Sequence, residues 1–407
     1  MGEWQRVPLG EAFEVQLGKM LGVGSDRGEQ SKYLANRNVQ WGQIVIDELG
    51  TMNFSPRERE RYRLQSGDLL VCEGGEVGRA ALWSDELPEC YFQNALHRLR
   101  ATTGADHRFM RYYFEFASMT GLLRGLTGQT SIGHLPRSKL VNWVVPFPPV
   151  EEQRRIAEIL DTIDETIQST ERVITKHKRI RSGLSDDLLN GKVGGDRPEN
   201  PKTSETPPPR AEPPRETCYQ VWGQVDDLVD LVTTKAHGQK PVGFPYIGLE
   251  HIEPGARTLT ATAPSSVSQS TNGVFAEGDI LFGKLRPNLR KALQVGCDGF
   301  CSTDILVLRT KAAVNPRYAT HAVASESVFR HAERNSIGTG MPRTSWLAVS
   351  QATVLVPPLE EQRRIAEILD NADETIRTHE EQRDKLQRMR SGLAADLLSG
   401  RVRTVAA

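Results

Sequence analysis

The sequence predicts an α+β fold in which two globular mixed α/β domains are joined by two long antiparallel helices, which form a coiled coil with pseudo-twofold symmetry. Three observations predict this plan. The chain has 407 residues, which is too long for one ordinary hydrophobic core. The fourteen residues PPVEEQRRIAEILD, beginning at Pro148, return as PPLEEQRRIAEILD from Pro357. A proline-rich segment lies between the two copies.

The two copies extend well beyond this opening stretch. Residues 148–193 align without a gap on residues 357–402, and 29 of the 46 positions are identical. The spacing of 209 residues between the copies is far longer than the roughly 20–50 residues of a solenoid repeat. The repeat therefore indicates a duplicated half-protein.

Each copy predicts one long helix. Two prolines precede it, and an acidic pair follows at the first turn, where the helix dipole favours negative charge. Apolar residues recur in steps of three and four, a pattern typical of coiled coils. The predicted coiled-coil and partner-binding positions are Ile156, Leu160, Ile163, Ile167 and Ile174 in the first copy and Ile365, Leu369, Ile376, Leu386 and Leu393 in the second. Antiparallel packing would bring Trp4 close to Gly400; the competing interpretation is one core helix for each domain.

The rest of the chain divides around these helices. The predicted segments are residues 1–147 for the first globular domain, 148–193 for the first repeat helix, 194–217 for the linker, 218–356 for the second domain and 357–402 for the second repeat helix. The linker holds seven prolines and has no apolar period, which is typical of an extended connection. In both domains short apolar runs bounded by Gly, Pro and Asp predict strands. Faint correspondences, such as SGDLLV and EGDILF, indicate that the domains share an ancestor.

Composition and missing motifs exclude several classes of function. The 51 basic and 52 acidic residues balance, so any anionic partner must be met by local clusters of charge. No apolar run is long enough to span a bilayer and no secretory signal begins the chain, which predicts a soluble cytoplasmic protein. The five cysteines lack the spacing of a metal site. No phosphate loop, methyltransferase, nuclease or nucleophile-elbow motif occurs, so we expect no catalysis, no metal and no cofactor on this chain.

Local clusters of basic and amide side chains do suit DNA, because such groups hold phosphates and read base edges. The alternating arginines Arg57 and Arg59 predict one face of a strand, although interleaved glutamates equally indicate a salt-bridged turn. The segment 284–291 predicts a phosphate-binding loop rather than a plain surface loop. Polar loops before each long helix carry Arg137 and Arg343 at matched places. The candidate DNA-binding residues are Asn36, Arg37, Asn38, Arg57, Arg59, Gln129, Thr130, His134, Arg137, Lys284, Arg286, Arg290, Lys291, Thr339 and Arg343.

This plan resembles the specificity subunit of type I restriction–modification enzymes. The segments VPFPPVEEQRRIAEILDTID and VPPLEEQRRIAEILDNAD carry the resemblance, which covers nearly the whole chain. It implies that each globular domain is a target-recognition domain that reads one part of a split, asymmetric sequence in double-stranded DNA. It further implies that the helices set the gap between the parts and dock two modification (methyltransferase) subunits. S-adenosylmethionine, ATP and Mg²⁺ would belong to the modification and restriction subunits.

Two other interpretations remain open from the residues alone. The chain could be a structural adaptor whose coiled coil joins two protein-binding modules, without any DNA. It could also be an orphan specificity protein that has lost its partner genes.

Overall fold

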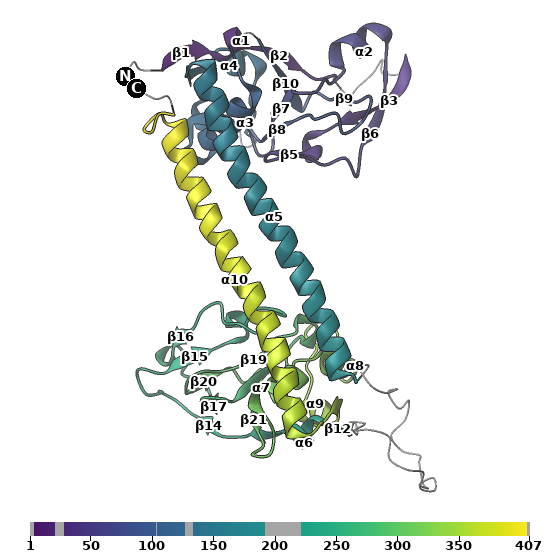
Figure 1. Cartoon of the computed structure of the whole chain (residues 1–407), viewed down its shortest axis with the longest axis vertical. Helices are drawn as coiled ribbons and strands as arrows, with labels where there is room; N and C mark the ends of the chain where they lie inside the picture. Colours follow the sequence, from purple (N-terminus) through teal and green to yellow (C-terminus); the bar gives the residue numbers. More distant parts are fainter. Residues whose placement is uncertain (1–3, 21–27, 103, 127–132, 192–220, 405–407) are drawn as a thin grey trace. The chain divides into compact units, whose positions relative to one another are not determined.

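The computed structural model describes residues 4–20, 28–102, 104–126, 133–191 and 221–404 of the chain (Figure 1). The chain forms two compact units, and the boundaries between them fall within the two long helices. Unit 1 comprises Met1–Glu171 and Glu381–Ala407, and unit 2 comprises Arg172–Glu380. Each long helix therefore begins in one unit and ends in the other.

Unit 1 is built on a four-stranded antiparallel sheet whose strand order is β2-β10-β7-β8. A second sheet, in the order β6-β3-β9, contains one parallel pair, β3 with β9. The strands are β1 (Gln5–Pro8), β2 (Phe13–Leu17), β3 (Glu29–Leu34), β4 (Val39–Gln40), β5 (Gln43–Ile44), β6 (Gly50–Phe54), β7 (Leu69–Cys72), β8 (Ala80–Leu82), β9 (Tyr91–Phe92), β10 (Leu96–Ala101) and β11 (Val144–Phe147). The helical elements are α1 (Leu9–Ala12), η1 (Asn36–Asn38), α2 (Pro56–Tyr62), α3 (His107–Met119), η2 (Leu122–Gly125) and α4 (Arg137–Val141).

Unit 2 repeats this plan. Its four-stranded antiparallel sheet has the order β13-β21-β18-β19, and its second sheet has the order β14-β17-β20-β15-β16 with one parallel pair, β15 with β20. The strands are β12 (Trp222–Gln224), β13 (Val229–Val232), β14 (Lys235–Ala236), β15 (Pro245–Ile247), β16 (Ala263–Pro264), β17 (Asn272–Phe275), β18 (Ile280–Gly283), β19 (Ala292–Gln294), β20 (Gly299–Cys301), β21 (Ile305–Thr310) and β22 (Thr353–Leu355). The helical elements are α6 (Val225–Leu228), η3 (Leu249–His251), η4 (Ser265–Val267), η5 (Pro287–Leu289), α7 (Pro316–Val323), α8 (Glu326–Arg334) and α9 (Trp346–Ser350).

An ion pair on a buried aspartate shows how closely the two sheets correspond. In unit 1 the guanidinium of Arg100 makes two hydrogen bonds, of 2.7 and 2.8 Å, with the carboxylate of Asp68. In unit 2 Arg309 binds Asp279 in the same way, at 2.8 Å for both bonds. Each aspartate is almost completely buried and follows the glycine of the repeated Gly-Asp pair. A carboxylate buried this deeply is tolerated because the arginine pairs with it in two-pronged geometry.

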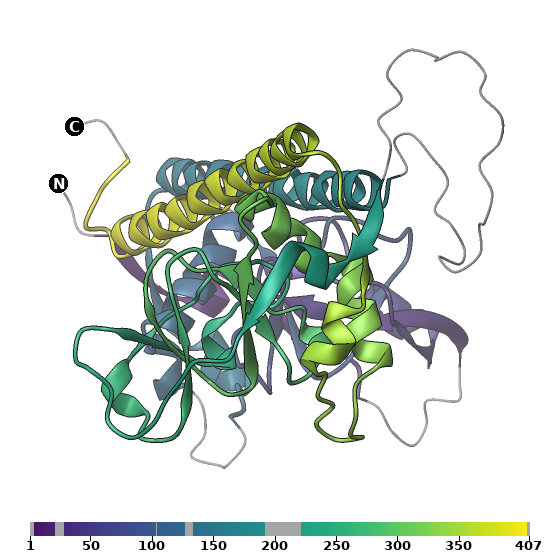
Figure 2. The same cartoon turned by 90° about the horizontal axis from the view of Figure 1, so that it is seen from below.

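The two long helices are α5 (Val150–Leu189) and α10 (Leu359–Leu398), each of 40 residues. Figures 1 and 2 show them side by side from two directions. Within unit 1 Asp164 of α5 binds Arg390 of α10 at 3.0 Å, and within unit 2 Arg181 binds Asp373 at 2.7 Å. Residue numbers rise along one helix as they fall along the other, which confirms the antiparallel arrangement. Trp4 lies against Gly400, as expected, with its ring 3.5 Å from where a Cβ of Gly400 would stand.

The repeated glutamine of each copy explains how the helix is attached to its domain. The Gln153 side chain donates to the carbonyl of Pro148 at 2.8 Å and accepts from the amide of Asp106 at 2.8 Å. Gln362 forms the same two bonds in unit 2, with Pro357 at 2.8 Å and with Asn315 at 2.9 Å. Both glutamines are buried, so these bonds fix the angle at which each helix leaves its domain.

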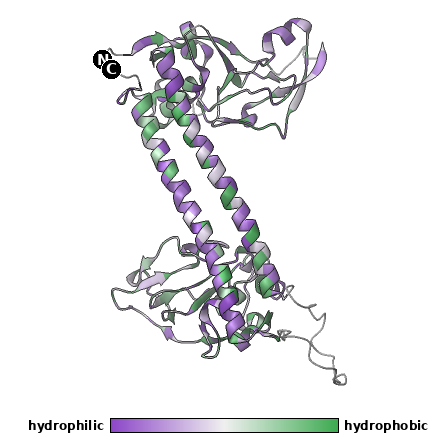
Figure 3. Cartoon of the chain, viewed as in Figure 1, coloured by the Kyte–Doolittle hydropathy of each residue, from purple (hydrophilic) through white to green (hydrophobic). Residues whose placement is uncertain are grey.

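The apolar stripe belongs partly to the domain cores. Of the predicted positions, Ile156 and Leu160 join the core of unit 1, and Ile365 and Leu369 join the core of unit 2. The far ends of the helices also enter the cores: the last two leucines of α10 (residues 397 and 398) pack in unit 1, and the last leucine of α5 (residue 189) packs in unit 2. Between these ends Ile163, Ile174 and Ile376 are buried, whereas Ile167 and Leu386 are half-buried. Hydrophilic residues cover much of the remaining helix surface (Figure 3).

One predicted stripe position is wrong. Leu393 is 36% exposed and does not line the buried seam. The helix turns Ala394 toward the core of unit 1 instead, and the buried stripe continues through Leu397 and Leu398. Ideal helices drift relative to a strict seven-residue repeat, so a pattern extended over 40 residues loses its phase near the end.

Candidate nucleic-acid interface

Two loops that the sequence singled out separately lie together in unit 2. One loop follows β18 and runs from Lys284 to Lys291; the other lies between α8 and α9. The amide of Arg286 donates to the carbonyl of Pro342 at 2.7 Å, and the amide of Thr344 donates to the carbonyl of Lys284 at 3.0 Å. These bonds make the two loops one continuous surface at the end of the main sheet.

The first loop has an unusual backbone. Arg286 and Arg290 have φ angles of 52° and 49° and flank the single turn η5. A left-handed conformation is uncommon for any residue other than glycine, and it persists where the surroundings hold it in place. Arg290 stabilises this backbone conformation, because its guanidinium pairs with Glu326 at 2.8 Å and with Glu333 at 2.5 Å. Its hydrogen bond with Glu326, the largest contribution, raises the pKa of Arg290 above its usual value.

The basic side chains of this surface differ in what they can offer DNA. Arg290 is engaged in its ion pairs, and Lys291 donates to the carbonyl of Leu249 at 2.7 Å, so both stabilise the loop. Arg343 is half-exposed while its Nε binds Asp304 at 3.0 Å, which leaves the outer edge of the guanidinium open. Arg286 is exposed, Thr339 is exposed on the second loop, and Lys284 is half-buried at the start of the first loop.

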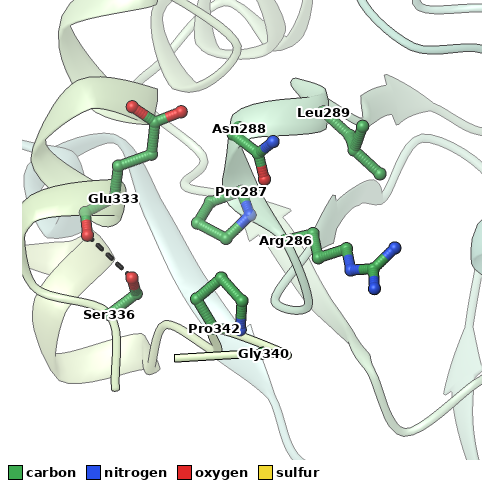
Figure 4. Close-up of a pocket in the computed structure, with 8 residues that line it drawn as sticks. All are labelled: Arg286, Pro287, Asn288, Leu289, Glu333, Ser336, Gly340 and Pro342. Carbon is green, nitrogen blue, oxygen red and sulfur yellow. Dashed lines mark hydrogen bonds between the residues drawn. The ribbon is translucent and has the colours of Figure 1, made fainter. Parts of the chain in front are cut away.

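A shallow pocket of about 420 Å³ opens between the two loops (Figure 4). Pro287 and Pro342 lie opposite each other across it, and the carbonyl of Glu333 accepts a hydrogen bond of 2.7 Å from the hydroxyl of Ser336 at its base. The side chain of Arg286 points away from Glu333, toward the outside of the pocket. The residues that line it are Arg286, Pro287, Asn288, Leu289, Glu333, Ser336, Gly340 and Pro342. Apolar walls with an amide and an arginine at the mouth suit the edge of a nucleobase.

Unit 1 brings the equivalent segments together. The amide of Leu135 donates to the carbonyl of Glu73 at 2.7 Å, so the loop before α4 meets the loop after β7. His134 is exposed and its Nε2 lies 3.1 Å from the Glu73 carboxylate. Arg137 is exposed although its Nε donates to the carbonyl of Val15 at 2.8 Å. The candidates Gln129 and Thr130 lie outside the described residues.

Of the predicted DNA-binding residues around Asn36, two hold the local backbone and one is exposed to solvent. Asn38 is buried, accepts from the amide of Ala35 at 2.9 Å and donates to the carbonyl of Val45 at 2.9 Å, so its side chain holds the turn η1. Asn36 donates to the carbonyl of Gly74 at 2.9 Å and thereby ties this turn to the loop after β7. Arg37 is exposed.

The interpretation of Arg57 and Arg59 as one face of a strand is wrong. Residues Pro56–Tyr62 form the helix α2, with Ser55 as its N-cap residue, and the carboxylate of Glu58 accepts a hydrogen bond from the Ser55 amide at 2.9 Å. Proline at the first helical position and a capping box favour this helix over an extended segment. Arg59 pairs with Glu89, which lies outside this segment and is not one of the interleaved glutamates of the predicted turn, and Arg57 is exposed.

Sequence reasoning missed His97, which is completely buried in β10 beneath the loop of unit 1. Its Nε2 donates to the carbonyl of Leu135 at 2.8 Å. Burial lowers the pKa of His97 to about 4 and raises the pKa of the neighbouring Glu73. A lone histidine in a strand gives no sequence signal for such a role, because its partner lies 38 residues away.

Comparison with known proteins identifies the family to which this architecture belongs. A family model described as the type I restriction modification DNA specificity domain matches residues 1–177 and 227–388. The chain belongs to this family. The specificity subunit of MjaVIII from Methanocaldococcus jannaschii is 22% identical, over 98% of this chain and 93% of its own length. That of EcoKI from Escherichia coli K12 is 23% identical, over 83% of this chain and 75% of its own length.

Solved structures share the fold. The S subunit of a type I restriction–modification system from M. genitalium superposes with a TM-score of 0.57 at 14% identity, covering 97% of this chain and 96% of that one. A chain from a study of complex assembly in a type I system has a TM-score of 0.56 at 17% identity and 98% coverage of both chains.

The chain is thus a DNA specificity subunit of a type I restriction–modification system, the non-catalytic component of that enzyme. Membership of such a complex makes DNA and the other subunits its partners. Within the described ranges no group of three His, Cys, Asp or Glu side chains could hold a metal ion. Of the helices that the structure describes, none combines the length and apolar character needed to cross a membrane.

Proposed function

We propose that the specificity subunit reads a split, asymmetric DNA sequence and that each unit reads one part of it. The supporting observation is the loop arrangement repeated in both units, where the loop after β7 or β18 meets the loop before α4 or α9. The side chains carried there differ, with Glu73 and His134 in unit 1 and Lys284 and Arg343 in unit 2. Two different surfaces on one scaffold suit two different half-sequences.

Within unit 2 the contacts divide by chemistry. The exposed guanidinium of Arg286 and the outer edge of Arg343 are suited to phosphates or to the two acceptors of guanine. Because the whole chain has a net charge of −1, the positive field that draws DNA into the complex must come largely from other subunits. Discrimination between bases is then the main task of this chain.

The helices α5 and α10 are proposed to set the gap between the half-sequences and to dock two modification subunits. Hydrophilic residues cover much of their exposed surface (Figure 3), and apolar residues near the helix ends pack into the cores. Exposed apolar side chains, among them Ile159, Ile180 and Met389, interrupt this hydrophilic surface. S-adenosylmethionine would bind to the modification subunits, and ATP and Mg²⁺ to the restriction subunits.

Mapping of methylated sites tests the proposal. The full chain is expressed with its modification subunit in a host without other DNA methylation, and the modified sites are sequenced. We expect one bipartite, non-palindromic site, and we expect Arg286→Ala to relax specificity in one half only. Lys311→Ala is the matched control, since it removes one positive charge at the opposite end of the same sheet. A palindromic site, or a change in both halves with Arg286→Ala, would refute the proposal.

A further inference from the structure

The second loop of unit 2 ends in a rigid hairpin, Ile337–Arg343. Two hydrogen bonds close it, from the amide of Ile337 to the carbonyl of Arg343 and from the amide of Arg343 to the carbonyl of Ile337, both 2.9 Å. Its base is held further by the bond from Arg286 to Pro342 and by the ion pair of Arg343 with Asp304. A short hairpin fixed at its base loses little conformational entropy when it is pushed into a partner.

This hairpin presents apolar side chains to solvent. Ile337 is 85% exposed and Met341 is 52% exposed. Ile337 therefore contributes almost nothing to the core of unit 2. A single exposed apolar residue needs no explanation by itself. Here, however, the triplet Ser-Ile-Gly of residues 336–338 also occurs at residues 131–133 of the first half, although the globular domains have otherwise diverged widely.

The surroundings of Ile337 are basic. Arg286, Arg334 and Arg343 are exposed on the same loops or at the end of α8, and Lys284 is half-buried beside them. Exposed apolar side chains on the same loops as exposed guanidinium groups match a polyanion with an apolar interior better than they match another protein surface. Double-stranded DNA has this construction, with phosphates outside and stacked bases within.

We propose that the Ile337–Arg343 hairpin is a wedge that unstacks one base step in the half-sequence read by unit 2. Ile337 enters between two base pairs, Met341 covers the exposed edge, and Arg343 holds a flanking phosphate, which leaves Arg286 to read a base edge beside the wedge. This inference rests on the proposed DNA-reading function of unit 2 and adds a mechanism to it. It predicts a preference for a flexible pyrimidine–purine step at that position, because such steps unstack most easily.

The test measures base stacking directly. The complex of the full chain with its modification subunit is bound to duplexes in which 2-aminopurine replaces one adenine at a time in that half of the mapped site. We expect a several-fold rise in fluorescence at one step with the wild-type chain. Ile337→Ala should abolish the rise and weaken binding about tenfold, as expected from the loss of a buried aliphatic side chain. Ile337→Leu should restore both.

A control separates the wedge from a general effect of apolar truncation. Val242 is 88% exposed on a different loop of unit 2, and Val242→Ala should change neither fluorescence nor affinity. Specific binding with no fluorescence change at any position, or an equal effect of Val242→Ala, overturns the wedge and leaves the proposed function standing. If the wild-type complex shows no sequence-specific binding, the proposed function itself fails and the wedge fails with it.

Discussion

Replacement of Arg390 by alanine should destabilise the protein more than the equivalent change in unit 2, Arg181→Ala. The Arg390 guanidinium binds Glu115 of α3 at 2.5 and 2.7 Å and Asp164 of α5 at 3.0 Å, so it joins three helices. All three side chains are at least three-quarters buried. Burial alone would lower the pKa of Arg390, but its bonds with the two carboxylates outweigh that effect and raise it.

The expected loss of stability depends on which partners Asp164 and Glu115 keep once the Arg390 side chain is removed. Asp164 keeps Arg111 at 3.5 Å, whereas Glu115 would lie partly buried beside a second carboxylate. Breaking a fully buried pair costs about 3–5 kcal/mol, and an exposed pair contributes about 0.2–1 kcal/mol. For this intermediate burial we expect Arg390→Ala to lower the free energy of unfolding by about 2 kcal/mol.

The equivalent change in unit 2 provides the comparison. Arg181→Ala removes the partner of Asp373, but Arg257 remains 3.5 Å from that carboxylate, so the loss should be about 1 kcal/mol or less. Arg154→Ala, at an exposed pair within one helix, is the control and should cost under about 0.5 kcal/mol. Urea unfolding followed by circular dichroism, and protection of amides in the unit that carries each substitution, measure all three. Arg181→Ala as costly as Arg390→Ala would refute this account.

Three further predictions concern acid stability, the helix seam and the division of labour. Burial lowers the pKa of His97 to about 4, so between about pH 6.5 and pH 4 the unfolded chain binds a proton at His97 and the folded chain does not. The free energy of unfolding should therefore fall in this range by about 1.4 kcal/mol per pH unit, and His97→Gln should flatten this slope in urea titrations. Ile163→Asp with Ile167→Asp should cost several kcal/mol and abolish binding of the modification subunit, measured by gel filtration, since Ile163 is 9% exposed; unchanged binding would count against docking on the helices. Exchange of residues 1–147 for another module should change one half-sequence only in methylation maps.

The sequence predicted the fold well because the strongest signal in it was long and periodic. Two gap-free copies with apolar residues in helical steps predicted two long helices. Their antiparallel pairing was predicted from the similarity of the two copies. The local errors have physical causes. Leu393 was placed in the seam because the coiled-coil pattern of three- and four-residue steps was extended over more turns than a straight helix keeps in phase. The segment around Arg57 was misread because alternation was weighed above its helix-capping residues.

The candidate site was less predictable, because it depends on contacts between segments far apart in the chain. The basic loop at Arg286 and the polar loop at Arg343 were each visible in the sequence. Nothing local showed that a bond from Arg286 to Pro342 would join them. Nor could composition show that Arg290 and Lys291 turn inward to hold their own loop. Long charged side chains choose between solvent and an ion pair according to neighbours that only the fold supplies.

The contacts also explain why the helices stayed alike while the domains diverged. Asp164 binds Arg390 and Arg181 binds Asp373, so each copy supplies both the acid and the base of a reciprocal pair. In a self-complementary interface, a residue changed in one copy loses its partner in the other. The partners that each domain adds to these pairs, Glu115 in unit 1 and Arg257 in unit 2, face no such constraint and carry opposite charges. The hairpin at Ile337 and the other recognition loops lie outside the reciprocal contacts altogether, so their sequences can change with the DNA target without disturbing the helices that join them.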